Sequence, residues 1–213
     1  NCFLIRHDVD YDINKAYEMA QLENEMGIKA TYFILLSTNN YNVFTFDNQK
    51  MICAIKEMGH EIGLHFDPSK YTNDINQHFE NQILLLNKII DNSIYSVSLH
   101  NPSMHNKYPN FSGYNNAYSK RFFNSSNYLS DARFNFRNKE PFDFIETIDD
   151  SVTQISLHPI HYSIEGEANY MPILKKIYHK NLLEFKNEFS LNSKAAEELC
   201  STNFIDDILK LIK

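Results

Sequence analysis

The stretch CFLIRHDVDYDINKAYEMAQLENEMGIKATYFILL, residues 2–36, decides the fold class. Its apolar start, Cys2 to Ile5, is typical of a buried strand and leads into the polar cluster Arg6 to Asp10. Asp12 suits a helix N-cap, and apolar residues then recur at helical spacing. A second apolar run, Ala30 to Leu36, is rich in aromatic and branched residues and predicts another strand. The stretch therefore predicts one strand–helix–strand unit.

The same alternation continues along the chain. The sequence predicts a strand from Glu61 to His65, a helix from Ile75 to Ile90, a strand from Tyr95 to His100 and a later strand from Thr153 to Leu157. This order is typical of parallel βαβ units with right-handed crossovers, as in an α/β barrel or a doubly wound sheet. Two helices are expected after Ala168.

Composition limits the classes of protein to consider. With 213 residues, 43% hydrophobic and 22% charged, the chain suits a single globular domain, expected to cover residues 1–213 with C-terminal helices from about 169. A net charge of -7 argues against nucleic acid as a partner. The sequence contains no transmembrane run and no signal peptide, so we expect a cytoplasmic protein whose N-terminus has been trimmed. It does not predict an oligomeric state.

Histidine and aspartate follow several of the predicted strands. Parallel α/β folds gather their active sites at the carboxyl ends of the strands, so these side chains should meet at one rim. They are Asp8, Asp10, His65, Asp67, His100 and His158. A single histidine of this kind is more often structural, but four strand ends in the same register predict a functional site.

Asp8 and Asp10 are two residues apart, so on an extended strand they point to the same side. Two adjacent carboxylates repel each other unless a cation or a shared proton lies between them. A divalent metal would resolve the repulsion, with one carboxylate as a ligand and the other as a base. Histidine nitrogens with a carboxylate and an open position form the zinc site that hydrolysis needs. An Asp-capped turn is the alternative.

Three motifs occur in a recognisable order. Asp8-Val9-Asp10 follows the first strand, Gly59-His60-Glu61-Ile62-Gly63-Leu64-His65 covers the third, and Leu157-His158-Pro159 comes late. Together with Ala30-Thr31-Tyr32-Phe33, they resemble the polysaccharide deacetylases, the NodB-homology domain or carbohydrate esterase family four, over about residues 3–165. The Gly-His-Glu-Ile-Gly-x-His string is fairly specific, whereas the other motifs are weak alone.

The resemblance implies a distorted (β/α) barrel with fewer than eight regular units. It implies a metal-dependent hydrolase that removes an N- or O-acyl group, usually acetyl, from a sugar. Matched position by position, Asp8 corresponds to the catalytic base and Asp10 to a metal-binding carboxylate. His65 corresponds to the first metal-binding histidine, and His158 to the histidine that acts as general acid. Zinc is the expected metal, with cobalt, manganese, nickel and iron as alternatives.

The chain departs from the family pattern in its metal ligands. The usual His-x-x-x-His places a second ligand at Ser69, and serine is a poor zinc ligand. We expect His100 to be the third ligand, with Asp67, a water molecule or no third protein ligand as alternatives. Arg6 or Arg133 could orient the base in place of the family's arginine.

Other polar residues near the motifs have possible supporting roles. Asp131 paired with Arg133 or His158 would hold the acid in its charged form, and His7 and His161 could contact substrate. Tyr108, Tyr114, Tyr118 and Tyr128 lie in or beside a polar loop, where they could stack on sugar rings or hold the loop in place.

The sequence is compatible with three functions. The first is deacylation of a polymer, a nucleotide- or lipid-linked sugar, or an intermediate of surface polysaccharide biosynthesis. The second is a non-catalytic carbohydrate-binding pseudoenzyme of the same fold, as the serine at position 69 suggests. The third is a metal amidase that acts on a non-sugar amide.

Overall fold

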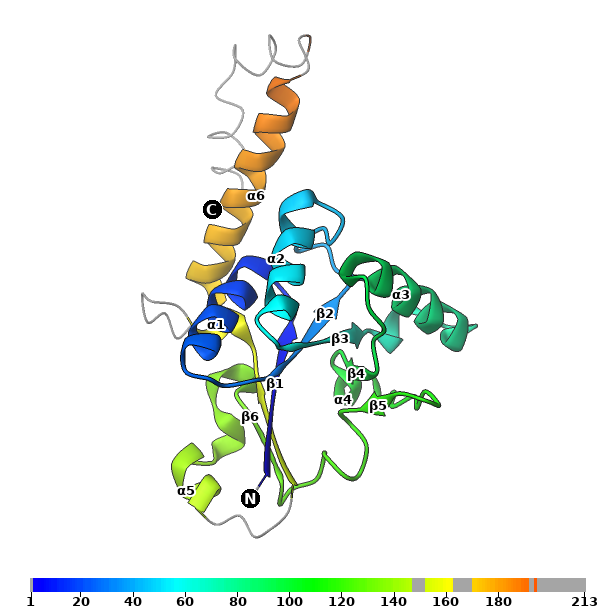
Figure 1. Cartoon of the computed structure of the whole chain (residues 1–213), viewed down its shortest axis with the longest axis vertical. Helices are drawn as coiled ribbons and strands as arrows, with labels where there is room; N and C mark the ends of the chain where they lie inside the picture. The colour runs from blue at the N-terminus through cyan, green and yellow to red at the C-terminus, as the bar shows by residue number, and fades with distance from the viewer. Residues whose placement is uncertain (1, 147–151, 163–169, 192–193, 195–213) are drawn as a thin grey trace. The chain divides into compact units, whose positions relative to one another are not determined.

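The computed structural model describes residues 2–146, 152–162, 170–191 and 194 (Figure 1). The chain divides into two units, Asn1–Ala168 and Asn169–Lys213. Helix α6, Tyr170–Ser190, belongs to the second unit and corresponds to the first of the two predicted C-terminal helices. The other, Ser193 to Ile212, lies outside the described residues apart from Lys194. That all 213 residues form one catalytic domain stays a prediction.

Seven parallel strands form one curled sheet in the first unit, in the order β5-β4-β3-β2-β1-β7-β6. The edges, β5 and β6, do not pair with each other, so the sheet is a half-barrel with fewer than eight units. This confirms the predicted distorted (β/α) barrel. The strands are β1 Cys2–Val9, β2 Thr31–Leu35, β3 Glu61–Phe66, β4 Ser96–Leu99, β5 Asn115–Asn116, β6 Tyr128–Ser130 and β7 Val152–Leu157.

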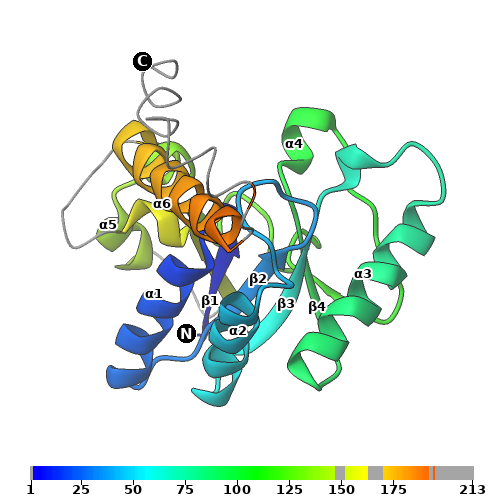
Figure 2. The ribbon, with the colours of Figure 1, turned by 90° about the horizontal axis from the view of Figure 1, so that it is seen from above.

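Three helices cover the outer face of the sheet: α1 Ile13–Glu25, α2 Phe46–Glu57 and α3 Ile75–Ile90 (Figure 2). α1 begins behind Asp12, whose carboxylate accepts a hydrogen bond from the backbone N–H of Asn14 at 2.9 Å, as the sequence predicts. The main core lies between these helices and the strands. Short helices complete the unit: η1 Pro68–Lys70, α4 Pro102–His105, η2 Ala132–Phe134, η3 Phe136–Asn138, α5 Pro141–Glu146 and η4 Pro159–His161.

The inner face of the sheet is polar. Barrel interiors are usually filled by branched apolar side chains, but here many inward positions hold charged, amide and hydroxyl groups, beside aromatic rings such as Phe33. The sequence predicts that the first strand ends with its apolar run at Ile5, but β1 extends to Val9. The strand can continue because the polar side chains of Arg6 and Asp8 fit the polar inner face. The polar cluster is thus part of the strand. The inward residues with at most 3% exposure include Arg6, Asp8, Ser98, Ser130, Gln154 and Ser156.

Arg6 and three aromatic rings occupy the interior halfway along the strands. The guanidinium carbon lies 5.9 Å from the centre of the Phe33 ring, 5.2 Å from that of Tyr118 and 5.9 Å from that of Tyr128. Phe33 in turn requires glycine at position 63, because a Cβ there would lie 2.5 Å from two of its ring carbons. We call Arg6, Phe33, Tyr118 and Tyr128 the central layer.

Candidate active site

Three potential metal ligands meet at the carboxyl ends of the strands. Asp10 follows β1, His65 lies near the end of β3, and His100 follows β4. Oδ1 of Asp10 lies 3.1 Å from Nε2 of His65 and 3.1 Å from Nδ1 of His100. The two nitrogens are 3.2 Å apart. Parallel pairing of β1, β2, β3 and β4 brings residues from positions 10, 65 and 100 to one point.

This arrangement fits a zinc-type ion. Ligands about 2.0–2.1 Å from a tetrahedral ion lie about 3.3 Å from one another, close to the separations found here. The other nitrogen of His65, Nδ1, is buried without a hydrogen-bond partner in the described part of the chain and lies 3.9 Å from Oδ1 of Asp8. Metal-bound histidines commonly have a carboxylate beside the outer nitrogen. The chemistry of the donor set and its surroundings therefore suits a divalent metal.

The electrostatics of Asp10 support the same conclusion. Burial raises the pKa of the Asp10 carboxyl, but hydrogen bonds and charge from His100 and His65 outweigh burial and hold the pKa well below its usual range. Asp10 is consequently a carboxylate at any pH near neutrality, which is the form that binds a cation.

Asp8 lies on the inner face of β1 and is held by Arg6. Nη1 of Arg6 contacts the two carboxylate oxygens at 2.5 and 2.6 Å, and Asp8 is only 3% exposed. Burial raises the pKa of Asp8, but the charge of Arg6, helped by His65 and His158, lowers it below its usual range. Asp8 is therefore ionised and fixed in orientation, and Arg6, one of the two arginines expected to orient the base, contacts it.

A histidine pair shares the carboxylate of Asp131 next to Asp10. Nδ1 of His158 lies 2.6 Å from Oδ1 of Asp131, and Nδ1 of His161 lies 2.9 Å from Oδ2. Nε2 of His158 lies 4.0 Å from Oδ2 of Asp10. Burial lowers the pKa of His158, but Asp131, with Asp8 and Asp10, raises it to about 9. His158 is thus a cationic acid at neutral pH.

The Asp131, His158 and His161 group could itself hold a metal by its donor types and spacing. Each histidine, however, has a short hydrogen bond to a different oxygen of Asp131, so the polar atoms facing one another are already paired. This pairing lowers the pKa of Asp131 to about 2, although burial opposes it. An Asp–His acid pair explains the geometry without an ion.

Asp67, the alternative third ligand, and Ser69, which stands at the position of the family's second histidine, lie outside the Asp10 cluster. The Asp67 carboxylate caps η1 by accepting from the backbone N–H of Ser69 at 2.9 Å and from its hydroxyl at 2.6 Å. Asp67 therefore has a local structural partner, and the serine oxygen is directed to Asp67.

His7 lies away from the site, and the expectation for the Arg133 side chain falls outside the described part of the structure. His7 points to the outer face of β1, where Nε2 lies 2.7 Å from Oε1 of Glu23 on α1, and its exposure is 0%. A position one residue along a strand changes the face, which separates His7 from its neighbours Arg6 and Asp8. Arg133 lies in η2, but its side chain is outside the described part of the structure.

Several contacts of the site were not anticipated from the sequence. The hydroxyl of Ser98 accepts from Nη1 of Arg6 at 2.6 Å, and the Asn101 amide lies 2.8 Å from Nε2 of His100. Tyr128 accepts from Nη2 of Arg6 at 3.3 Å. The position of Ser98 could have been predicted from the sequence, because it lies two residues before His100 and residues two apart in extended backbone share a face. The packing of Tyr118 and Tyr128 on Arg6 gives them an internal role, in the central layer.

Comparisons with known proteins bear on the fold. Neither a protein-family model nor a curated protein matches the sequence. A chitin deacetylase from the fungal pathogen Colletotrichum lindemuthianum aligns over 83% of this chain and 82% of its own, with 12% identity and a TM-score of 0.51. The chain has the fold of the family 4 carbohydrate esterases. At this identity the likeness extends to the fold alone.

Two further structures share the family 4 esterase fold. The peptidoglycan deacetylase PdaC from Bacillus subtilis aligns over 93% of this chain and 96% of its own, with 12% identity and a TM-score of 0.51. A mutant of a family 4 pseudoenzyme from Bacillus anthracis with restored enzymatic activity aligns over 84% of this chain at 10% identity, with a TM-score of 0.50. This chain spans only 63% of that mutant's length.

Within the described residues, no helix combines the length and the apolar character that a membrane crossing requires.

Proposed function

We propose that this chain is a metal-dependent hydrolase that removes an N- or O-linked acyl group, usually acetyl, from a sugar or a glycan intermediate. One observation carries the proposal: the Asp10 carboxylate has one oxygen against His65 and His100 and its other oxygen 4.0 Å from the acid His158. A candidate metal site and a candidate proton donor thus share one carboxylate. The family 4 esterase fold supports this assignment and the proposed membership of that family.

Asp10, His65 and His100 are the proposed metal ligands. A bound divalent ion, zinc in the first place, would supply a Lewis acid for the acyl carbonyl and for the attacking water. The low pKa of Asp10 favours ion binding because no proton has to be displaced from its carboxylate. Cobalt, manganese, nickel or iron could serve at the same three ligands.

Asp8 is the proposed general base. It is ionised, and Arg6 holds its carboxylate beside the ligand His65. It would accept a proton from water as the new C–O bond to the acyl carbon forms. Because Arg6 also stabilises the ionised form, the reaction keeps an available base down to mildly acidic pH.

His158 is the proposed general acid. As the C–N or C–O bond to the sugar breaks, the leaving nitrogen or oxygen takes the proton from Nε2, because Nδ1 faces Asp131. An amine is a poor leaving group without this proton, so N-deacylation should depend on His158 more than O-deacylation does. The products are a free amine or alcohol and a carboxylate such as acetate. His161 would act through Asp131 as a positioning residue.

The test is acetate release by the metal-loaded protein from chitooligosaccharides, peptidoglycan fragments and acetylated xylan. The chelated protein should be inactive, and one of zinc, cobalt, manganese, nickel or iron should restore activity. His158→Ala should lose activity but keep the metal, whereas His105→Ala, on the exposed helix α4, should behave as the wild type. No metal binding and no release under any of these conditions would exclude the proposal.

A carbohydrate-binding protein without catalysis is the second candidate. The position of Ser69, whose hydroxyl bonds to Asp67, is the observation that favours it. It predicts saturable binding of the same oligosaccharides without acetate release at any metal loading. A panel of simple N-acyl amides in the same assay would detect the third possibility, an amidase for substrates other than sugars.

A further inference from the structure

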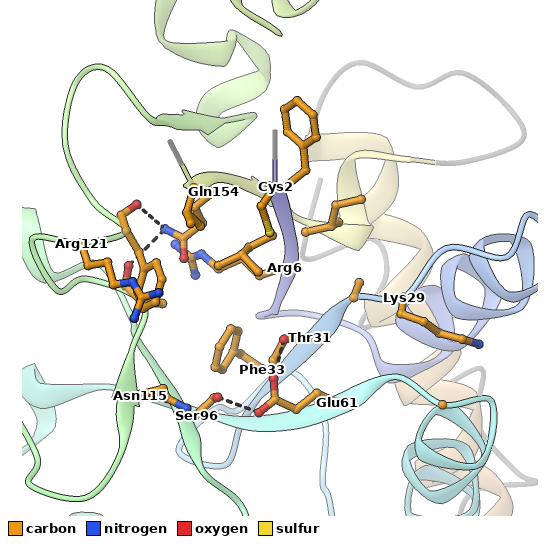
Figure 3. Close-up of a pocket in the computed structure, with 18 residues that line it drawn as sticks. Cys2, Arg6, Lys29, Thr31, Phe33, Glu61, Ser96, Asn115, Arg121 and Gln154 are labelled. Carbon is orange, nitrogen blue, oxygen red and sulfur yellow. Dashed lines mark hydrogen bonds between the residues drawn. The ribbon is translucent and has the colours of Figure 1, made fainter. Parts of the chain in front are cut away.

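A second cavity opens at the opposite ends of the strands from the Asp10 cluster. Its volume is about 510 Å³, and its walls come from the first residues of β1, β2, β3, β4, β5 and β7 (Figure 3). We call it the amino-terminal cavity. Arg6 and Phe33 of the central layer form its inner end, so it lies on the far side of that layer from the proposed catalytic residues.

Most polar groups in the cavity wall are paired within the protein. Glu61 accepts hydrogen bonds from the hydroxyls of Thr31 and Ser96, at 2.7 and 2.6 Å. The Gln154 amide donates to the carbonyls of Ala117 and Phe122, both at 3.1 Å. Figure 3 shows these bonds along the wall. The Glu61 carboxylate, which is the acidic group in the cavity wall, therefore accepts hydrogen bonds from two hydroxyl groups of the protein.

Two cationic donors at the cavity lack such partners among the described residues. Nε of Arg6 is buried without a hydrogen-bond partner among the described residues, although the side chain is only 2% exposed. Its terminal nitrogens contact Asp8, Ser98 and Tyr128 instead. Arg121 is exposed, rests 5.2 Å from the Phe122 ring and pairs with no carboxylate in the described part of the chain.

The remaining surface of the cavity is both apolar and cationic. Phe33, Phe122 and Leu4 supply apolar walls. Lys29 lies at the rim, but its ammonium points away from the cavity and donates to Asn24 and to the Met58 carbonyl (Figure 3). An unpaired buried N–H carries a free-energy cost that a ligand acceptor would remove. The charge of Arg6 is balanced by Asp8, and the Arg121 guanidinium is a cation at the cavity that has no carboxylate partner among the described residues.

We infer that the amino-terminal cavity binds a small organic anion, with its oxyanion head accepting from Arg6 and Arg121 and its short apolar body against Phe33 and Phe122. The ligand must carry an oxyanion head group, which could be a carboxylate or a phosphate. The volume of about 510 Å³ accommodates a metabolite-sized molecule.

Calorimetric titration of the full chain tests this inference with three probes: butyrate, inorganic phosphate and the neutral isostere butyramide. Butyrate or phosphate should bind in the millimolar range or tighter, and competition between them should tell which head group is preferred. Butyramide should bind at least about tenfold more weakly than the preferred anion, because the charged hydrogen bonds are lost. Equal affinity for butyrate and butyramide, with no phosphate binding, would contradict the inference, as would no saturable binding of either anion.

Variants locate the bound anion. Arg121→Ala should weaken binding roughly tenfold. Lys50→Ala removes the same charge on the exposed face of α2 and should leave affinity unchanged. Leu4→Trp fills the cavity from a half-exposed position and should abolish binding without a loss of melting temperature. His100→Ala should keep binding, since it alters only the other end of the strands. Binding that survives Leu4→Trp and disappears in His100→Ala would place the anion at the metal cluster and overturn the inference.

Discussion

Arg6 and Asp8 lie two residues apart on β1, and one nitrogen of the guanidinium contacts the two oxygens of the carboxylate at 2.5 and 2.6 Å. Both side chains are at most 3% exposed. This short-range pair joins the polar interior of the half-barrel to the proposed base. Arg6 thus holds the proposed base from the same strand, whereas the sequence left Arg6 and Arg133 as candidates for that role.

Replacement of Arg6 by methionine should be strongly destabilising. It leaves a buried carboxylate without its counter-charge, and loss of one partner of such a pair lowers the free energy of unfolding by about 3–5 kcal/mol. Chemical denaturation measures the change. Arg121→Met removes an exposed arginine that pairs with no carboxylate among the described residues, and the variant should stay within about 0.5 kcal/mol of the wild type. Equal stability of the two variants would show that the pair contributes little.

Loss of the Asp131 charge should move the alkaline limit of activity to lower pH. The pKa of His158 is raised to about 9, so the acid is protonated below that value and is lost as the pH rises through it. Asp131→Asn removes the main raising influence, and the limit should fall by about 1–3 pH units. The pH–rate profile of acetate release checks this, with an NMR titration of His158 as a second readout. His105→Gln is the control, and an unchanged limit in Asp131→Asn would refute the assignment.

Metal affinity should depend on His100 and be insensitive to Ser69. His100→Ala removes one of three proposed ligands and should weaken zinc binding more than the roughly 10–100-fold typical of an outer-shell partner. Ser69→Ala removes a hydroxyl that bonds to Asp67 and should change affinity less than about threefold. Competition with a chromogenic chelator measures both. A larger effect at Ser69 than at His100 would reverse the proposed ligand set.

Gly63→Ala should strain the central layer. The added methyl group would lie 2.5 Å from the Phe33 ring and 2.9 Å from the Ser96 carbonyl oxygen, and overpacking of this kind costs about 1–3 kcal/mol. In a Phe33→Leu background the cost should be smaller, because a leucine can move aside. A double-mutant cycle by thermal or chemical denaturation measures the coupling. Additive effects would mean that the two positions do not share the strain.

Much of the fold follows from local patterns. The alternation of strands and helices, the capping role of Asp12 and the late strand ending before His158 are all visible in the sequence. The extent of β1 is not, because the polar side chains of Arg6 and Asp8 suggest a loop until the inner face of the sheet is known to be polar. A boundary rule based on apolar runs cannot detect such a strand.

The site was predictable where strand ends carry the information. Asp10, His65 and His100 follow from the rule that parallel strands present their carboxyl ends at one rim. Two orientations do not follow from this rule. Asp67 faces its near neighbour Ser69, and His7 faces Glu23, which lies on the helix that follows the strand. Sequence spacing gives proximity along the chain, but only the packed structure decides which face a histidine occupies.

The central layer has a consequence for molecular traffic. The Arg6 guanidinium lies among three aromatic rings, so the central layer separates the carboxyl-terminal half of the half-barrel interior from its amino-terminal half. If the proposed deacylation takes place beside Asp10, the central layer lies between the reaction and the amino-terminal ends of the strands, so acetate would leave from the side on which the sugar binds. Substrate and product would then use the same side of the sheet, and the turnover of the proposed reaction would depend on how quickly the deacylated sugar leaves that side.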